Sequence, residues 1–123
     1  MNSDHLEAQA LAILESLNRT PFEQCTPITR EFKNLTANAS LYVIRHRELG
    51  LLYVGKTSYT RERFRGGHKA FLWSWLDYYN PDDVRIQIYP LDFLQLQTLS
   101  SQLEAVMIAA AKPPYNVRYP AIN

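Results

Sequence analysis

Residues 40–68 have the sequence SLYVIRHRELGLLYVGKTSYTRERFRGGH, and this stretch decides the fold. Two short apolar runs, Leu41–Ile44 and Leu51–Val54, flank a polar segment that ends in Gly50. β-Forming residues on both sides of a charged turn are typical of a β-hairpin. The rest of the chain is therefore expected to pack around a two-stranded antiparallel ribbon.

Tyr42 and Tyr53 lie one on each arm of this hairpin. With a loop of two residues or of four, Tyr42 pairs with Tyr53 or with Gly55. In either register both tyrosines face the same side of the ribbon, because side chains alternate along each strand. A three-residue bulged loop would separate them onto opposite sides, so the same-side prediction depends on the loop.

Apolar periodicity places the remaining elements on either side of the hairpin. A stripe of leucine and alanine predicts a helix over Ser3–Asn18, and residues 19–39 are expected to be mostly loop, with a short turn at Arg30–Asn34. Beyond the hairpin we expect two helices, a third strand and a final helix, at about Tyr59–Arg65, His68–Tyr79, Val84–Tyr89 and Thr98–Lys112. This order indicates an α/β fold: a small, three-stranded, mainly antiparallel sheet flanked by helices, with an N-terminal helical extension.

The second of these helices has large apolar side chains at helical spacing, which is typical of a face buried in the core. They are Phe71, Leu72, Trp75, Leu76 and Tyr79. Gly66 and Gly67 are expected to end the preceding helix, because glycine tolerates a left-handed C-cap.

Length and composition are those of a single domain: 123 residues, 46% of them hydrophobic. The expected organisation is an extension at 1–39, a core domain at 40–118 and a tail at 119–123. A single cysteine excludes a disulfide framework and fits a reducing compartment. No apolar run approaches the roughly 18 residues of a membrane span, and the N-terminus lacks a signal-peptide pattern, so we expect a soluble, cytoplasmic protein.

Positive charge is concentrated in one part of the chain. The formal net charge is only +1, but residues 44–69 contain seven bases and two acids. A nucleic-acid backbone is a natural partner for such a stretch, and a solvated, ion-paired face is the alternative. Arg61, Arg65 and Lys69 are the candidate contacts to phosphate.

Glu104 is the only acid in the apolar stretch Leu103–Ala111 of the last predicted helix. A buried, unpaired carboxylate is costly, so it needs a cation or a proton. One Mg²⁺ or Mn²⁺ ion, completed by water and a substrate phosphate, meets this need. Two alternatives remain open: Ser101 and Glu104 have capping-box spacing, and an arginine could pair with the acid.

Tyr42 and Tyr53, close in sequence to Lys56 and Arg63, are candidates for acid–base chemistry. Positive charge beside a phenol favours the phenolate and lowers its pKa from about 10, and such a tyrosine could deprotonate an attacking water. Arg63 could stabilise a pentavalent phosphoryl transition state, contact a neighbouring phosphate or be a surface charge. For the tyrosines the alternative is packing alone.

Two further polar positions are less specific. His68 is a candidate proton shuttle or phosphate ligand, or simply a residue at a helix start. Asn116 follows the final helix, and its amide could position the hairpin or a phosphate. Its alternative is an ordinary turn residue after Pro113-Pro114.

The order and spacing of these residues resemble the GIY-YIG nuclease family over residues 40–118. The corresponding elements are Ser40-Leu41-Tyr42, Tyr53-Val54-Gly55, Arg63, Glu104 and Asn116. Lys56 and the run Gly-Gly-His-Lys-Ala are similar to a cyanobacterial branch of that family. One departure is Ser40 at the position of the family's first glycine, where serine is expected to weaken a close backbone approach.

The resemblance implies a metal-dependent DNA endonuclease with one Mg²⁺ or Mn²⁺ ion at Glu104. The catalytic positions it implies are Tyr42, Tyr53, Lys56, Arg63, His68 and Asn116. One rival interpretation is a non-catalytic nucleic-acid-binding module that keeps the nuclease fold. Another is a protein-interaction domain whose contact is the N-terminal helix. The joint presence of the tyrosines, the arginine, the glutamate and the asparagine favours the enzyme.

Overall fold

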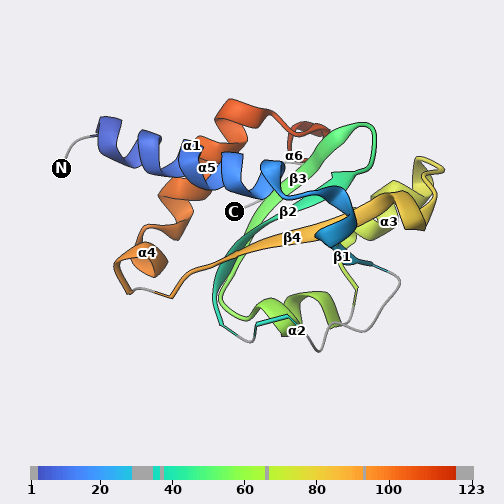
Figure 1. The fold of residues 1–123 in the computed structure, drawn as a ribbon, viewed down its shortest axis with the longest axis horizontal. Coiled ribbons are helices and arrows are strands. Elements are labelled where there is room, and N and C mark those ends of the chain that lie inside the picture. The colour runs from blue at the N-terminus through green and yellow to red at the C-terminus, as the bar shows by residue number, and fades with distance from the viewer. Residues whose placement is uncertain (1–2, 29–34, 37, 66, 93, 119–123) are drawn as a thin grey trace.

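The computed structural model describes residues 3–28, 35–36, 38–65, 67–92 and 94–118 (Figure 1). The α-helices are α1 (Ser3–Arg19), α2 (Thr60–Arg65), α3 (Lys69–Leu76), α4 (Leu94–Thr98), α5 (Ser100–Ala111) and α6 (Pro114–Arg118). The strands are β1 (Thr26–Pro27), β2 (Ser40–His46), β3 (Gly50–Thr57) and β4 (Val84–Pro90), with 3₁₀ turns η1 (Phe22–Gln24) and η2 (Pro81–Asp83) before β1 and β4. The turn expected at Arg30–Asn34 and the tail at 119–123 lie outside the described residues. None of the helices described here has the length and apolar character needed to cross a membrane.

The strands form one antiparallel sheet in the order β1-β4-β2-β3 (Figure 1). The α/β class and the antiparallel sheet are confirmed, but the prediction of three strands was one short. The additional strand, β1, consists of Thr26 and Pro27, which pair with Ile86 and Arg85 of β4. So short a strand shows no alternation of side chains, and its proline argues for loop, so it could not be recognised in the sequence.

The loop of the β2–β3 hairpin is odd in length, yet most of the hairpin has the register of an even loop. His46 pairs with Gly50 across residues 47–49, whereas farther from the turn Ile44 pairs with Tyr53. The register therefore shifts by one residue between these two pairs, which is a β-bulge on β3. With this loop and no bulge, the two tyrosines of the hairpin would face opposite sides of the sheet.

The extra residue of the bulge is Leu52. Residues of a regular strand alternate between the two faces. Here Leu52 and Tyr53 pack against the same hydrophobic cluster, while Leu51 and Val54 pack against the other. Tyr42 of β2 belongs to the cluster of Tyr53. The same-side arrangement of the tyrosines is thus confirmed, through a bulge rather than an even loop.

One hydrophobic cluster covers each face of the sheet. On the first face, α1 and α5 pack side by side and bury Leu17, Leu103 and Met107 against the strands (Figure 1). On the second face, Phe64 of α2 and Ala70 of α3 pack with the tyrosines. The N-terminal helix therefore supports the face of the sheet that does not contain the tyrosines.

Helix α3 buries a different face from the one expected. It ends at Leu76, and the side chains of Leu72, Trp75 and Leu76 are more than half exposed. Its buried residues are the small Ala70 and Ser74. Small side chains let the helix lie close to the aromatic residues of the sheet, so the predicted core stripe was wrong for the three large residues.

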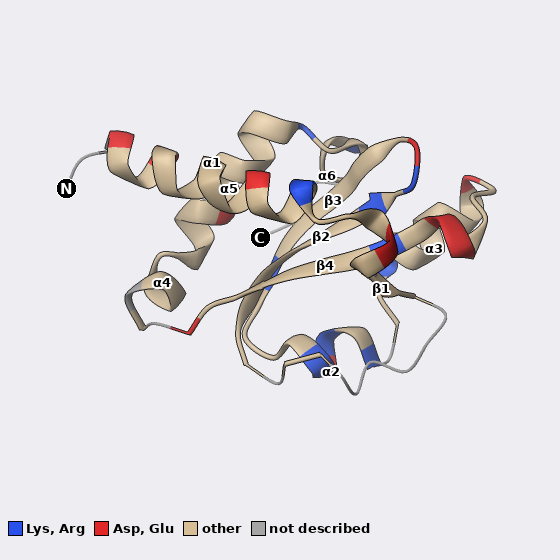
Figure 2. Ribbon diagram, viewed as in Figure 1, with Lys and Arg blue, Asp and Glu red and all other residues tan. Residues whose placement is uncertain are grey.

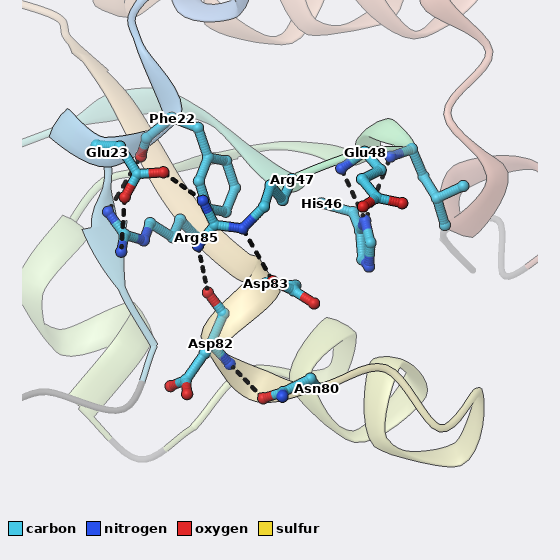
Figure 3. A network of polar contacts seen from close by, with 10 residues as sticks. Phe22, Glu23, His46, Arg47, Glu48, Asn80, Asp82, Asp83 and Arg85 are labelled. Carbon is cyan, nitrogen blue, oxygen red and sulfur yellow. Dashed lines mark hydrogen bonds and ion pairs between the residues drawn. The ribbon is translucent and has the colours of Figure 1, made fainter.

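At the turn end of the hairpin, basic residues are paired with acids (Figure 3). Arg47 forms ion pairs with Glu23 and with Asp83, the latter 2.9 Å from Nε to Oδ1. Arg85 lies 3.6 Å from the second oxygen of Glu23, and both guanidinium groups lie over the ring of Phe22. These contacts join η1 to the ends of β2 and β4. Within the basic stretch at 44–69, Arg47 is therefore ion-paired, as the alternative expects.

Candidate active site

Gly55 leaves space on β3 for the ring of Tyr42. A Cβ atom at residue 55 would lie 2.5 Å from both Cζ and Oη of Tyr42 and 2.9 Å from Cε2 of Tyr53. The centroids of the two phenol rings are 6.2 Å apart. The Tyr42 hydroxyl therefore lies over β3, which is an edge strand of the sheet.

His68 is hydrogen-bonded to Tyr42, with 2.7 Å between Nε2 and Oη. It is also the N-cap of α3, where its Nδ1 accepts a hydrogen bond from the main-chain N–H of Ala70 at 2.9 Å. Burial, assisted by the charges of Arg63 and Lys69, lowers the pKa of His68 to about 3. The ring is therefore neutral at physiological pH, and its proton is on Nε2 because Nδ1 is an acceptor. His68 thus donates a hydrogen bond to the Tyr42 oxygen.

Arg63 of α2 is close enough to Tyr42 for its charge to favour the ionised phenol. Its helix is fixed at the first residue, Thr60, whose buried Oγ1 donates to the carbonyl of Asn38 at 2.6 Å. Oγ of Ser40 lies 2.6 Å from the same Oγ1, and it is the donor because the Thr60 proton is already engaged. Ser40 therefore joins β2 to α2. Sequence reasoning missed Thr60, although a hydroxyl residue at a helix start was a usable signal.

Both tyrosines are harder to ionise than a free phenol. Burial is the main cause that raises the pKa of Tyr42, and burial followed by the charge of Glu104 raises the pKa of Tyr53. The charge of Arg63 opposes the rise at both positions. The expectation that nearby cations lower the phenol pKa was wrong, because desolvation outweighs the favourable charge.

Glu104 lies on α5, within electrostatic reach of both tyrosines. The helix begins after Leu99, which makes no side-chain capping bond, so Glu104 is in the second turn and the capping-box alternative is excluded. Burial raises the pKa of Glu104, whereas the charge of Lys56, the main-chain N–H of Lys56 and the charge of Lys69 lower it. The cationic neighbours are thus lysines, not the arginine of the second alternative.

A partly buried carboxylate with a raised pKa is stabilised by additional positive charge. Within the described ranges, no three or more His, Cys, Asp or Glu side chains form a group able to hold an ion by themselves. Glu104 therefore fits an ion that takes one protein carboxylate and completes its coordination with water and substrate oxygens, as Mg²⁺ does. It does not fit a zinc-type cage of protein ligands.

Asn116 of α6 positions β3. Its Oδ1 accepts a hydrogen bond from the N–H of Val54 at 2.7 Å, and its Nδ2 donates to the carbonyl of Val54 at 2.9 Å. Two residues along the strand, Lys56 lies close enough to the Glu104 carboxylate to favour its charged form. Side chains from α5 and α6 therefore occupy the outer edge of β3. Of the roles expected for Asn116, the structure shows the positioning of the hairpin.

The three predicted nucleic-acid contacts differ in their surroundings. Arg61 donates from Nε and Nη2 to the carbonyl of Leu35, at 3.2 and 3.0 Å, so it holds the segment before β2. Arg65 is exposed and pairs with an acid one turn earlier at 3.1 Å. Lys69 is exposed, and its Nζ lies 5.9 Å from the centroid of the Tyr53 ring. Figure 2 shows the basic residues of α2 well away from the hairpin turn.

The fold and the site define a small α/β domain in which phenols, a guanidinium and a carboxylate gather at the edge of an antiparallel sheet. The family model described as the GIY-YIG catalytic domain matches residues 38–116. The match covers more than half of the chain, so the chain belongs to the GIY-YIG family of nucleases, whose substrates are nucleic acids. No curated protein and no solved structure gives a significant match.

Proposed function

We propose that the protein is an endonuclease that hydrolyses DNA phosphodiester bonds with one Mg²⁺ or Mn²⁺ ion. The family supports nuclease chemistry. The observation on which the proposal rests is that His68 is hydrogen-bonded to the Tyr42 hydroxyl, with the Arg63 guanidinium and Glu104 within electrostatic reach of it. A buried tyrosine usually finds one hydrogen-bond partner. A cation beside an oxygen that already has such a partner indicates an oxygen that takes up negative charge during a reaction.

Glu104 would hold the ion through its carboxylate. When bound, the ion would polarise the phosphate, stabilise the departing oxygen and add positive charge beside Tyr42. In the absence of the ion, the charges of Lys56 and Lys69 partly balance the Glu104 carboxylate. With the carboxylate neutralised, both lysines would be available to the phosphates of the substrate.

Tyr42 is the proposed general base. Its phenolic proton would first pass to solvent, and the Nε2–H of His68 and the charge of Arg63 would stabilise the resulting phenolate. The phenolate oxygen would then accept a proton from the attacking water as the new bond to phosphorus forms. Arg63 would also neutralise charge on the pentavalent phosphorus. The bond to the leaving oxygen then breaks, and that oxygen takes a proton from solvent. Tyr53, half-buried beside Tyr42, would orient the water.

Incubation with supercoiled plasmid and with branched DNA tests this function. We expect cleavage with Mg²⁺ or Mn²⁺ and none after chelation with EDTA. Glu104→Ala and Arg63→Ala should each lower the cleavage rate by roughly 100-fold or more, because each removes a charge needed in the transition state. Circular dichroism should show that both variants remain folded.

Glu15 and Arg19 offer matched controls. They form an exposed ion pair of 3.4 Å on α1, which packs on the face of the sheet away from the tyrosines. Glu15→Ala and Arg19→Ala should cleave as the unmodified chain does. Cleavage that survives Glu104→Ala would refute the metal assignment. Salt-sensitive binding without cleavage under any metal would instead favour the non-catalytic binding module.

A further inference from the structure

A groove of about 480 Å³, lined by both polar and apolar groups, borders the candidate active site. It lies between the segment that joins β3 to α2 and the α4–α5 region. Its lining includes Asn38, Lys56, Ser58, Tyr59 and Ser100. Apart from Lys56, none of these residues belongs to the motifs or to the proposed chemistry.

The lining of this groove suits a nucleotide. Lys56 is an exposed cation, Ser58 and Ser100 contribute hydroxyl groups, and no acid is among the described residues that line it. A cation with hydroxyl donors is a suitable site for a phosphate. Tyr59 is 68% exposed, and an open aromatic ring is a platform on which a base can stack.

Lys56 connects the groove to the active site. Its charge acts on the Glu104 carboxylate, and the same residue lines the groove. The preceding residue, Gly55, lies under the ring of Tyr42. A DNA strand whose scissile phosphate lies at Tyr42 and Glu104 would therefore place a neighbouring nucleotide in the groove.

We propose that this groove binds one unpaired nucleotide next to the scissile phosphate. Its base stacks on Tyr59, and its phosphate is held by Lys56 and the serine hydroxyls. The groove has the volume of a small-molecule pocket, so it admits a single nucleotide but not a stacked duplex. The inference rests on the proposed nuclease function, and it specifies the substrate: DNA with a single-stranded flap or branch is bound in preference to continuous duplex.

The test is a binding titration in EDTA with flap DNA that contains 2-aminopurine at successive positions from the junction. The chain contains Glu104→Gln, so that the DNA stays intact. One position should show quenched fluorescence, because that base stacks on Tyr59. Adding Tyr59→Ala should abolish the quenching and weaken flap binding roughly tenfold, the size of one base–aromatic stack, and leave duplex binding unchanged. Tyr59→Phe should keep both properties.

Tyr78→Ala is the matched control, because Tyr78 is 95% exposed and lies outside the groove lining. Unchanged quenching and affinity in Tyr59→Ala would overturn the groove proposal, whether or not plasmid is cleaved. Quenching that depends on Tyr59, with no cleavage under any metal, would uphold the groove and overturn the endonuclease. Failure of the chain to bind any DNA would overturn both.

Discussion

The ring of Tyr42 lies so close over Gly55 that no side chain fits at residue 55 without displacing it. Gly55→Ala should therefore push Tyr42 away from His68. Overpacking of this kind costs about 1–3 kcal/mol in the free energy of unfolding, which urea titration measures. The imidazole resonances of His68 should shift in NMR spectra, because its Nε2–H loses the Tyr42 oxygen.

Gly50 provides the control for this prediction. It has a φ of +82°, and no atom lies within 4 Å of the position that a Cβ would take, so Gly50→Ala introduces only backbone strain. Gly50→Ala should lose stability but keep the His68 resonances in place. Native stability and unshifted His68 resonances in Gly55→Ala would show that the two rings can move apart freely.

The fold could be predicted where side chains repeat with a clear period. α1 at Ser3–Arg19 and β4 at Val84–Pro90 lie within one residue of the expected ranges because each has one regular apolar face. The bulge at Leu52 could not be predicted, because Leu51–Val54 is apolar throughout and offers no alternation to count. β1 forms only because it pairs with β4, and the local sequence of β1 does not indicate this pairing.

The sequence indicated which residues lie together in the candidate site, but not the direction in which their pKa values shift. Arg63, Glu104 and the two tyrosines lie together as the motif spacing suggests. The sign of the tyrosine pKa shift was wrong because it depends on burial, which appears only once helices cover the sheet. The contact of His68 with Tyr42, 26 residues earlier, also depends on the fold.

Stability should rise with pH across the acidic range because of His68. Its pKa falls from 6.5 to about 3 on folding, so between these values the unfolded chain binds more protons than the folded one. Stability is therefore lost as pH falls through this window, by up to about 1.4 kcal/mol per pH unit. Urea unfolding at several pH values measures the slope.

His68→Asn keeps a side chain suited to an N-cap but removes the titrating group. Its stability should depend less on pH within the same window. His46→Asn, at the end of β2, should retain the slope that His68 causes. An equal slope in the chain and in His68→Asn would show that His68 is not the source.

Glu104→Gln should separate metal binding from folding. Because burial raises the pKa of Glu104, the folded state holds its proton more tightly than the unfolded state, and stability is lost as pH rises through that raised pKa. The neutral amide has no charge to desolvate and so escapes this loss, and at alkaline pH in EDTA the variant should be at least as stable as the native chain. Thermal unfolding measures the difference.

The same variant should not respond to Mg²⁺. A ligand that binds only the folded state raises Tm. Added Mg²⁺ should therefore raise the Tm of the native chain and leave that of Glu104→Gln unchanged, independently of any cleavage assay. Equal shifts in the two proteins would place the ion elsewhere.

Alanine variants of Arg61 and Arg65, both on α2, should separate an effect on stability from an effect on DNA binding. Arg61→Ala removes two hydrogen bonds to the carbonyl of Leu35 and should cost about 1–2 kcal/mol in stability. Arg65→Ala removes an exposed ion pair and should change stability by less than about 0.5 kcal/mol. In a salt titration of DNA binding, Arg65→Ala should lower the slope by about 1, the value for one lost phosphate contact. An unaltered slope would show that Arg65 does not touch DNA.

The positions of Asn116 and Glu104 at the outer edge of β3 also affect how the chain associates with other molecules. An open strand at the border of a sheet can recruit a strand from another molecule, which is a common start of aggregation. At β3 the outward-facing N–H and carbonyl of Val54 are already satisfied by the amide of Asn116, and Glu104 lies near Lys56 farther along the strand. The side chains of the C-terminal helices therefore protect the edge of β3 from pairing with another molecule. Substitutions that remove them would threaten solubility as well as catalysis.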